Sequence, residues 1–316
     1  MKSFSVMDAA AEPFRLVGRR PLATLVWGLV ILVPSFGVFA MMAPMWLEMM
    51  QAAAVDPAAA QTADPFDGDF AAMMQFQVWS NLLSLIQLFM TLFVTTAIVR
   101  AVLAQKRGDR WMFMRAGMDE LRFAVAVLGV FVGLYALIVV AVLLAVGLGF
   151  ALWSLPDPWR WIAYVVLGLG SILGFALLWG RLALIPPASI ALGDFAFVEG
   201  WKMGRGHTWR LFGLSLVMLM IYLLIGAAFL VVFFVVIAIG AGSMAVVSDP
   251  QAIEAWFEGL GRQPGLLIGA GLVLLLPMAW LQGFSQALGT APHAHVVAQL
   301  RPAPTPISPD TGAVAE

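Results

Sequence analysis

The side chains that most often carry chemistry are scarce in this chain of 316 residues, beginning with histidine. Three histidines occur: His207 stands among basic residues, and His293 and His295 form the sequence PHAH. Two imidazoles at positions i and i+2 can share a metal ion in an extended segment, but a zinc site needs further ligands and none stands nearby in the sequence. We therefore predict no metal site and a structural role for the histidines.

Sequence motifs of enzymes and nucleotide-binding proteins are absent as well. The chain has no cysteine, which excludes disulfides, thiol catalysis and cysteine-bound metals. The patterns H-E-x-x-H, G-x-S-x-G and G-x-x-x-x-G-K-[ST] do not occur. The glycines of GLGRQPG, at 259–265, lack the preceding strand that a dinucleotide site needs. The sequence thus predicts no catalytic residue, no cofactor and no enzyme activity.

A row of polar side chains runs through one otherwise apolar stretch. Spacings of three and four residues place its members on one face of a helix. They are Asn81, Ser84, Gln87, Thr91 and Thr95. Hydrogen bonds between membrane helices are one explanation of this polar stripe; the lining of a pathway for a solute is the other. No ionisable residue stands at mid-membrane, which argues against proton-coupled transport.

The composition identifies the surroundings in which these residues act. AVILMFWYC residues make up 62% of the chain and DEKR residues 11%, compared with about 25% charged residues in soluble domains. A soluble protein of this length cannot bury so much apolar surface in one core, so the chain is expected to be an all-α integral membrane protein. Its net charge of −1 provides no field that would attract nucleic acid.

Runs without charge predict six membrane-spanning helices, since about 20 apolar residues suffice for one crossing. They are expected near 22–46, 76–104, 123–153, 161–184, 211–243 and 265–290. Residues 1–20 would form an amphipathic segment, 21–290 the membrane domain, and 291–316 a Pro-rich, disordered tail. Gly129-x-x-x-Gly133 and Gly170-x-x-x-Gly174 suit close contact between helices.

The basic residues predict the orientation of the bundle. With the N-terminus inside, 15 of the 17 Lys and Arg residues fall on the inner side, and Arg160 and Arg262 on the outer side. The positive-inside rule then places both termini in the cytoplasm, with the chain in a bacterial inner membrane. The outer segment 47–75 contains acids and no base. It is either a hydrophilic connection or a vestibule that attracts cations.

Three stretches on the inner side resemble one another: 14–28, 114–129 and 201–216. Each has a bulky apolar residue, a base, a glycine and further bases before a spanning helix. This repeat predicts three helical hairpins of the same orientation around a pseudo-threefold axis. Arg100 and Arg181 end the returning helices of the first two hairpins, where long side chains can extend toward the surface.

The inner segments are predicted to be amphipathic. In 8–20, Asp8, Glu12, Arg15 and Arg19 share one helical face. Such helices lie at the membrane interface and contact anionic headgroups, or they pack under the bundle and supply the charges that set topology. The candidate headgroup contacts are Arg107, Arg110, Arg115, Lys202, Arg205 and Arg210.

The stretch after the fourth predicted helix resembles a known group of proteins. Its matching elements are Arg181-Leu182, Pro186 or Pro187, Trp201-Lys202, Arg205-Gly206 and Trp209-Arg210-Leu211-Phe212. They resemble bacterial six-helix inner-membrane proteins grouped around the membrane domain of glycerophosphoryl diester phosphodiesterases. In the two-domain relatives, chemistry belongs to a separate soluble barrel with His and Glu metal ligands. We expect that domain and its activity to be absent from this chain.

Three functions are compatible with these observations. The first is a non-enzymatic structural, scaffold or lipid-interacting role, with membrane lipids as partners. The second is a small-solute transporter or channel that uses the polar stripe. The third is an accessory subunit of a partner enzyme or transporter. The sequence specifies neither a substrate nor an oligomeric state.

Overall fold

The computed structural model describes residues 3–55, 70–103, 113–114, 117–240 and 264–301, and all regular structure in them is helical. The long helices are α2 (Pro21–Val55), α4 (Phe70–Leu103), α5 (Met118–Leu152), α6 (Trp159–Leu182), α9 (Thr208–Gly240) and α12 (Pro264–Leu300). The short helices are α1 (Val6–Arg19), α7 (Ile185–Leu192) and α8 (Phe197–Met203). The prediction of an all-α protein is confirmed for this part of the chain.

Five stretches of the described residues are long and apolar enough to cross a membrane. They are Pro21–Val38, Met73–Leu103, Met118–Leu152, Trp159–Leu192 and Thr208–Val232. The chain is therefore a multi-pass membrane protein. The crossing expected near 265–290 is not among these stretches and stays a prediction.

The last helix extends well beyond its predicted end. Residues 291–300 were expected to begin a disordered tail, yet α12 continues to Leu300. Packing is the reason, because Ala294, Val296 and Val297 are fully buried, and α1 lies against this helix. Residues 302–316 of the predicted tail lie outside the described residues.

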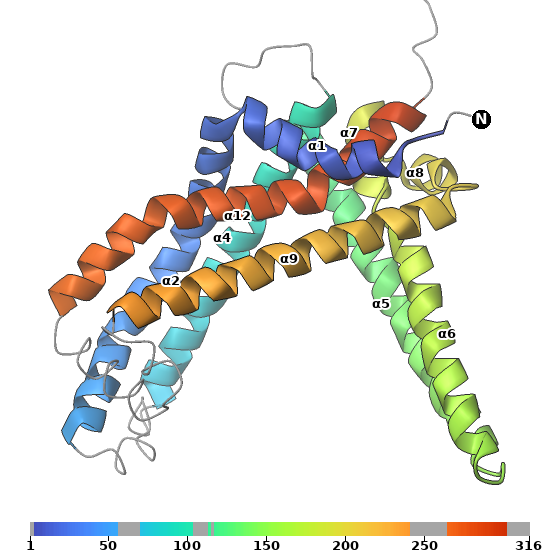
Figure 1. Cartoon of the computed structure of the whole chain (residues 1–316), viewed down its shortest axis with the longest axis horizontal. Coiled ribbons are helices and arrows are strands. Elements are labelled where there is room, and N and C mark those ends of the chain that lie inside the picture. The colour runs from blue at the N-terminus through green and yellow to red at the C-terminus, as the bar shows by residue number, and fades with distance from the viewer. Residues whose placement is uncertain (1–2, 56–69, 104–112, 115–116, 241–263, 302–316) are drawn as a thin grey trace, which may run out of the picture.

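Two pairs of helices diverge from a common end of the molecule (Figure 1). α2 and α4 pack together on one side, and α5 and α6 form a separate hairpin on the other. The short helices α1, α7 and α8 lie at the end where these pairs meet, and α9 and α12 run obliquely across the molecule. The buried helix α7 touches α4, α5 and α12 there, so it joins the two pairs.

The tightest crossing is between α2 and α12. A Cβ atom on Gly28 would overlap the carbonyl group of Ala279, and one on Gly283 would overlap the carbonyl oxygen of Thr24. Thr24 and Ala279 are themselves fully buried. Small residues four apart on both helices thus bring the two backbones together, a common means of helix association in membranes.

The segment between α6 and α9 folds as two short helices. Gly193 ends α7 with φ 69°, a left-handed conformation that glycine adopts at little cost. The buried hydroxyl of Ser189 donates to the carbonyl of Ile185 at 3.1 Å and accepts from the N–H of Ala196 at 3.2 Å. These bonds hold the start of α8 against α7.

Candidate functional site

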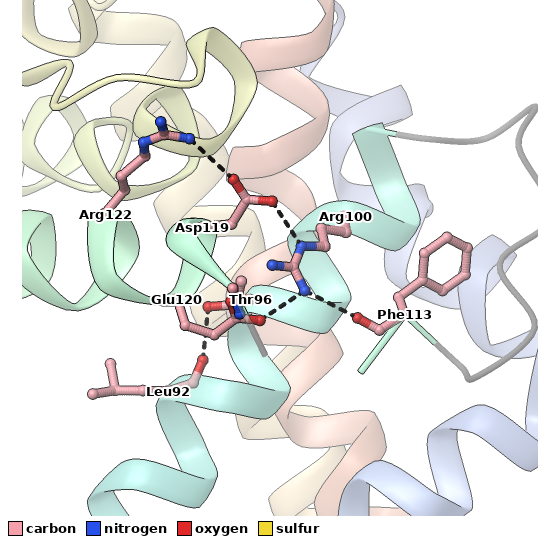
Figure 2. Close-up of polar contacts among 8 residues, drawn as sticks. Leu92, Thr96, Arg100, Phe113, Asp119, Glu120 and Arg122 are labelled. Atoms are coloured by element: carbon pink, nitrogen blue, oxygen red, sulfur yellow. Dashed lines mark hydrogen bonds and ion pairs between the residues drawn. The ribbon is translucent and has the colours of Figure 1, made fainter. Parts of the chain in front are cut away.

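Polar and charged side chains of the described residues gather where α1, α7 and α8 meet the ends of the long helices. The most connected of them is Arg100, in the last turn of α4. Figure 2 shows it facing the start of α5, with acidic residues on that helix and a backbone carbonyl around it. Acidic residues also suit the first turn of a helix, because they complement its dipole.

Arg100 makes an ion-pair network that ties α4 to α5. Its Nε lies 3.1 Å from Oδ2 of Asp119, and its NH1 lies 2.7 Å from Oε1 of Glu120. Arg122 contributes a second contact to Asp119, at 3.4 Å. The side chains of Arg100 and Glu120 are only 14% and 19% exposed. Arg100 is therefore held inside the protein by these partners, although its place at the helix end would allow its side chain to extend toward the surface.

The residue that completes this network is Phe113. Its carbonyl accepts a hydrogen bond from NH1 of Arg100 at 3.3 Å, and its buried ring lies 4.3 Å from the guanidinium of Arg20. Phe113 has φ 64°, a left-handed conformation that bulky residues rarely adopt. The contacts with Arg100 and Arg20 offset that backbone strain and connect three parts of the chain at one point.

Arg181 has a comparable place at the end of α6. Its Nε donates to Oγ1 of Thr208, the first residue of α9, at 2.8 Å. Its guanidinium also lies 5.2 Å from the ring of Trp201 in α8, which suits a cation–π contact. Arg181 thus fastens the end of one spanning helix to the start of the next, as Arg100 does.

A third polar contact joins α1 to α12. The Oε2 atom of Glu12 lies 3.4 Å from Nδ1 of His295, and Nε2 of His295 lies 2.9 Å from Nε2 of Gln299. Glu12 is only 3% exposed, whereas Asp8 and Arg15 of the same helix are exposed and pair with each other at 3.2 Å. The predicted charged face of α1 is therefore divided: Glu12 faces the bundle, and its neighbours face outward.

The two histidines of PHAH lie on a helix and point to different partners. Nδ1 of His293 bonds the carbonyl of Gly289 at 3.3 Å, whereas His295 faces Glu12. Desolvation lowers the pKa of His293, and its hydrogen bond to Gly289 acts in the opposite direction. Among the described residues, no group of His, Asp and Glu side chains is arranged to hold a metal ion.

The candidate headgroup contacts fall into two groups. Arg107, Arg110 and Arg115 lie outside the described residues. Lys202 is in the last turn of α8, Arg205 lies in the turn that follows, and Arg210 is in the first turn of α9. Arg205 and Arg210 are exposed, and Trp209 between them is 67% exposed. The described part of the chain offers no ion pair to these three basic residues.

The predicted polar stripe lies on α4, and its hydroxyls are mostly satisfied by that helix. Ser84, Thr91 and Thr95 each donate to the carbonyl four residues earlier, at 2.6–2.8 Å. Asn81 accepts from Gln77 of its own helix at 3.4 Å. Gln87 makes the one bond to another helix that is found for the stripe among the described residues, with Ser35 of α2 at 3.3 Å. Hydrogen bonding between helices thus accounts for one member of the stripe.

Sequence reasoning did not find the acidic partners of Arg100, or the pairing of Glu12 with His295. The bases at helix ends were the available signal, because a cation near a buried helix end needs an anion. Comparisons of the chain with protein-family models, with curated proteins and with solved structures gave no match.

Proposed function

We propose that this protein is a non-enzymatic, multi-pass membrane protein whose inner face engages lipid headgroups. Its contact surface consists of Lys202, Arg205 and Arg210, together with Trp209. The observation that carries the proposal is the exposure of these basic side chains beside an exposed tryptophan, without acidic partners among the described residues. Basic residues attract anionic headgroups, and tryptophan favours the membrane interface.

The distribution of apolar side chains supports this placement. The hairpin of α5 and α6 exposes large apolar residues along its length, including Leu143, Phe150 and Ile172. Such a surface is stable in lipid, whereas Arg100, Arg181 and Glu12 make their polar contacts at helix ends near α1, α7 and α8, which lie together at one end of the molecule (Figure 1). The headgroup layer would then run past the α8–α9 corner.

Charge reversal at Lys202 and Arg205 tests the proposal. A basic residue near an anionic surface contributes about 1 kcal/mol, or about fivefold in affinity. We expect the double variant Lys202→Glu, Arg205→Glu to bind phosphatidylglycerol at least tenfold more weakly in lipid titrations of the purified full chain. Arg160→Glu, at the α5–α6 turn, is the matched control and should bind normally. Unchanged binding in the double variant would reject this surface as the lipid contact.

The proposal includes a six-helix architecture of three hairpins. It also places the protein in a bacterial inner membrane with both termini in the cytoplasm. Contacts between successive hairpins support the architecture: Arg100 joins α4 to the start of α5, and Arg181 joins α6 to the start of α9. Glu12 and His295 join α12 back to α1. Each returning helix would thus fasten the first segment of the next hairpin, as a cyclic repeat requires.

Transport through the polar stripe is the second candidate, supported by the bond between Gln87 and Ser35. Replacing Asn81 and Gln87 by Leu should leave proteoliposome flux at the level of empty vesicles if the lipid role holds. Solute flux in the unmodified protein that collapses in this variant would favour transport. An accessory-subunit role is tested by co-purification of partner proteins with the intact chain.

A further inference from the structure

A cavity of about 670 Å³, shallow and wide open to the surroundings, lies beside the first residues of α1. Its volume falls in the range of small-molecule sites, roughly 300–1,000 Å³. It lies where three helices end: α1 and α9 begin there, and α12 finishes there. The lining residues are Ser3, Phe4, Ser5, Asp8, Arg210 and Gln299.

One side of the cavity favours negative charge. Arg210 lies in the first turn of α9, and Ser5 caps the first turn of α1 by accepting the N–H of Asp8 at 3.3 Å. The first N–H groups of a helix lack partners within it and carry a partial positive charge. Ser5 and the Asp8 carboxylate already complement the start of α1, so the start of α9 and Arg210 form the part of the cavity that suits the oxygens of a phosphate group.

The other side favours positive charge. The carboxylate of Asp8 is 52% exposed, and its ion pair with the exposed Arg15 is of the weak surface kind. Gln299 lies in the last turn of α12, where the final carbonyl groups of the helix carry a partial negative charge. Asp8 and Arg210 line the same cavity, yet the described residues include no ion pair between them. Opposite charges held apart in one cavity suit a zwitterion better than a simple anion.

We propose that this cavity binds the headgroup of phosphatidylethanolamine. Arg210 and the start of α9 hold the phosphate, and Asp8 with the end of α12 receives the ammonium group. The inference rests on the proposed function, because both assign this face to lipid headgroups. It adds a lipid class and a specific site. The ammonium of ethanolamine donates N–H bonds to Asp8, whereas the trimethylammonium of choline has no N–H to donate.

The experiment is a lipid titration of the delipidated full-length protein in detergent, with bound lipid counted by native mass spectrometry. The lipids are phosphatidylethanolamine, phosphatidylcholine and phosphatidylglycerol of the same acyl chains, and glycerophosphoethanolamine represents the free headgroup. We expect about tenfold tighter binding of the ethanolamine lipid than of the choline lipid, because only the ethanolamine ammonium donates hydrogen bonds to the Asp8 carboxylate. We expect the free headgroup to bind more weakly than the lipid, because only the lipid has acyl chains that stay in the micelle beside the protein.

Two variants divide the site. Arg210→Gln should weaken binding of both zwitterionic lipids about tenfold, because each has the phosphate. Asp8→Asn should weaken the ethanolamine lipid more than the choline lipid, because only the ethanolamine lipid also loses N–H bonds to the carboxylate, and the two affinities should become similar. Asp157→Asn is the control for Asp8→Asn, since Asp157 also pairs with a nearby arginine but lies at the distant α5–α6 turn. Circular dichroism establishes that each variant keeps its helices.

The outcomes separate this inference from the proposed function. Equal affinity for ethanolamine and choline lipids, or normal binding by both Arg210→Gln and Asp8→Asn, overturns the cavity site. If binding of phosphatidylglycerol still requires Lys202 and Arg205, the proposed contact surface is retained even though the cavity site is rejected. The reverse result would be that binding of the ethanolamine lipid requires Asp8 and Arg210, while binding of phosphatidylglycerol is unaffected by the Lys202 and Arg205 substitutions. That result rejects the contact surface and retains the cavity site. Equal binding of the free headgroup and the lipid would assign the cavity to a soluble ligand and refute the lipid site.

Discussion

Replacing Arg100 by Gln is expected to destabilise the protein strongly, through the acidic residues that it leaves behind. Arg100 and Glu120 are 14% and 19% exposed and lie 2.7 Å apart. Removing one partner of a buried ion pair costs about 3–5 kcal/mol, because the other charge stays buried without compensation. Asp119 keeps its contact with Arg122, so we expect Arg100→Gln to lose about 3 kcal/mol, near the lower limit.

A double-mutant cycle separates the ion pair from other effects of the substitution. Glu120→Gln leaves Arg100 with Asp119 and the carbonyl of Phe113, so about 1–2 kcal/mol should be lost. The double variant has no uncompensated charge at this pair. It should therefore be more stable than the sum of the single effects predicts, by at least about 1 kcal/mol, which is typical of residues in direct contact.

The assay is unfolding of the purified protein by SDS in mixed micelles, followed by tryptophan fluorescence. Arg160→Gln is the matched control, because Arg160, itself 22% exposed, pairs at 2.9 Å with Asp157, which is 62% exposed. Asp157 is thus left in contact with solvent when Arg160 is replaced, and we expect a loss of at most about 1 kcal/mol. Additive losses within about 0.5 kcal/mol in the cycle would refute the argument. A loss at Arg160 as large as that at Arg100 would refute it too.

Three further predictions follow from particular contacts. Gly283→Leu should prevent α2 and α12 from packing, because a side chain there meets the backbone of Thr24. Gel filtration checks this through loss of the monodisperse peak. Gly174→Leu is the control, because Gly174 has open space around it. Because the pKa of His293 is lowered in the folded protein, the unfolded chain binds more protons just below its ordinary value of about 6.5, so stability should fall as pH decreases through that region. The fall should be smaller in His293→Asn, and an unchanged profile would contradict the assignment. A reporter that is active only in the periplasm should be inactive when fused after Arg301, and activity there would overturn the proposed orientation.

The long helices were predictable because their cause is local. A run of about 20 apolar residues is stable only as a helix in lipid, and the sequence locates such runs without knowledge of their neighbours. Helix ends were less predictable, because tertiary packing decides them. α12 continues to Leu300 since Val296 and Val297 are buried, and PHAH on its own favours no helix.

The tightest helix crossing does not involve the predicted glycine pairs, although one of their members, Gly129, lies so close to Phe197 of α8 that a Cβ there would overlap its ring. Gly170-x-x-x-Gly174 has the spacing that favours association, yet a Cβ on either glycine would have no neighbour within 4 Å among the described residues. The crossing uses Gly28 and Gly283 instead. Their small partners, Thr24 and Ala279, are four residues away on each helix. Spacing shows which helix faces can approach closely, but the choice of partner depends on the whole bundle.

The polar contacts were missed for a related reason, and they explain how orientation and packing are linked. Arg100 and Arg181 belong to the basic residues that predict the inner side, and each also binds the beginning of the next spanning segment. A helix end that carries such an arginine cannot cross the membrane cheaply, and its partner on the next helix must remain on the same side to compensate it. The same side chain therefore favours one orientation of its helix and stabilises packing against the next helix. At the junction of α12 with α1, Glu12 and His295 provide the contact, so three different pairs of residues perform one task that periodicity alone does not reveal.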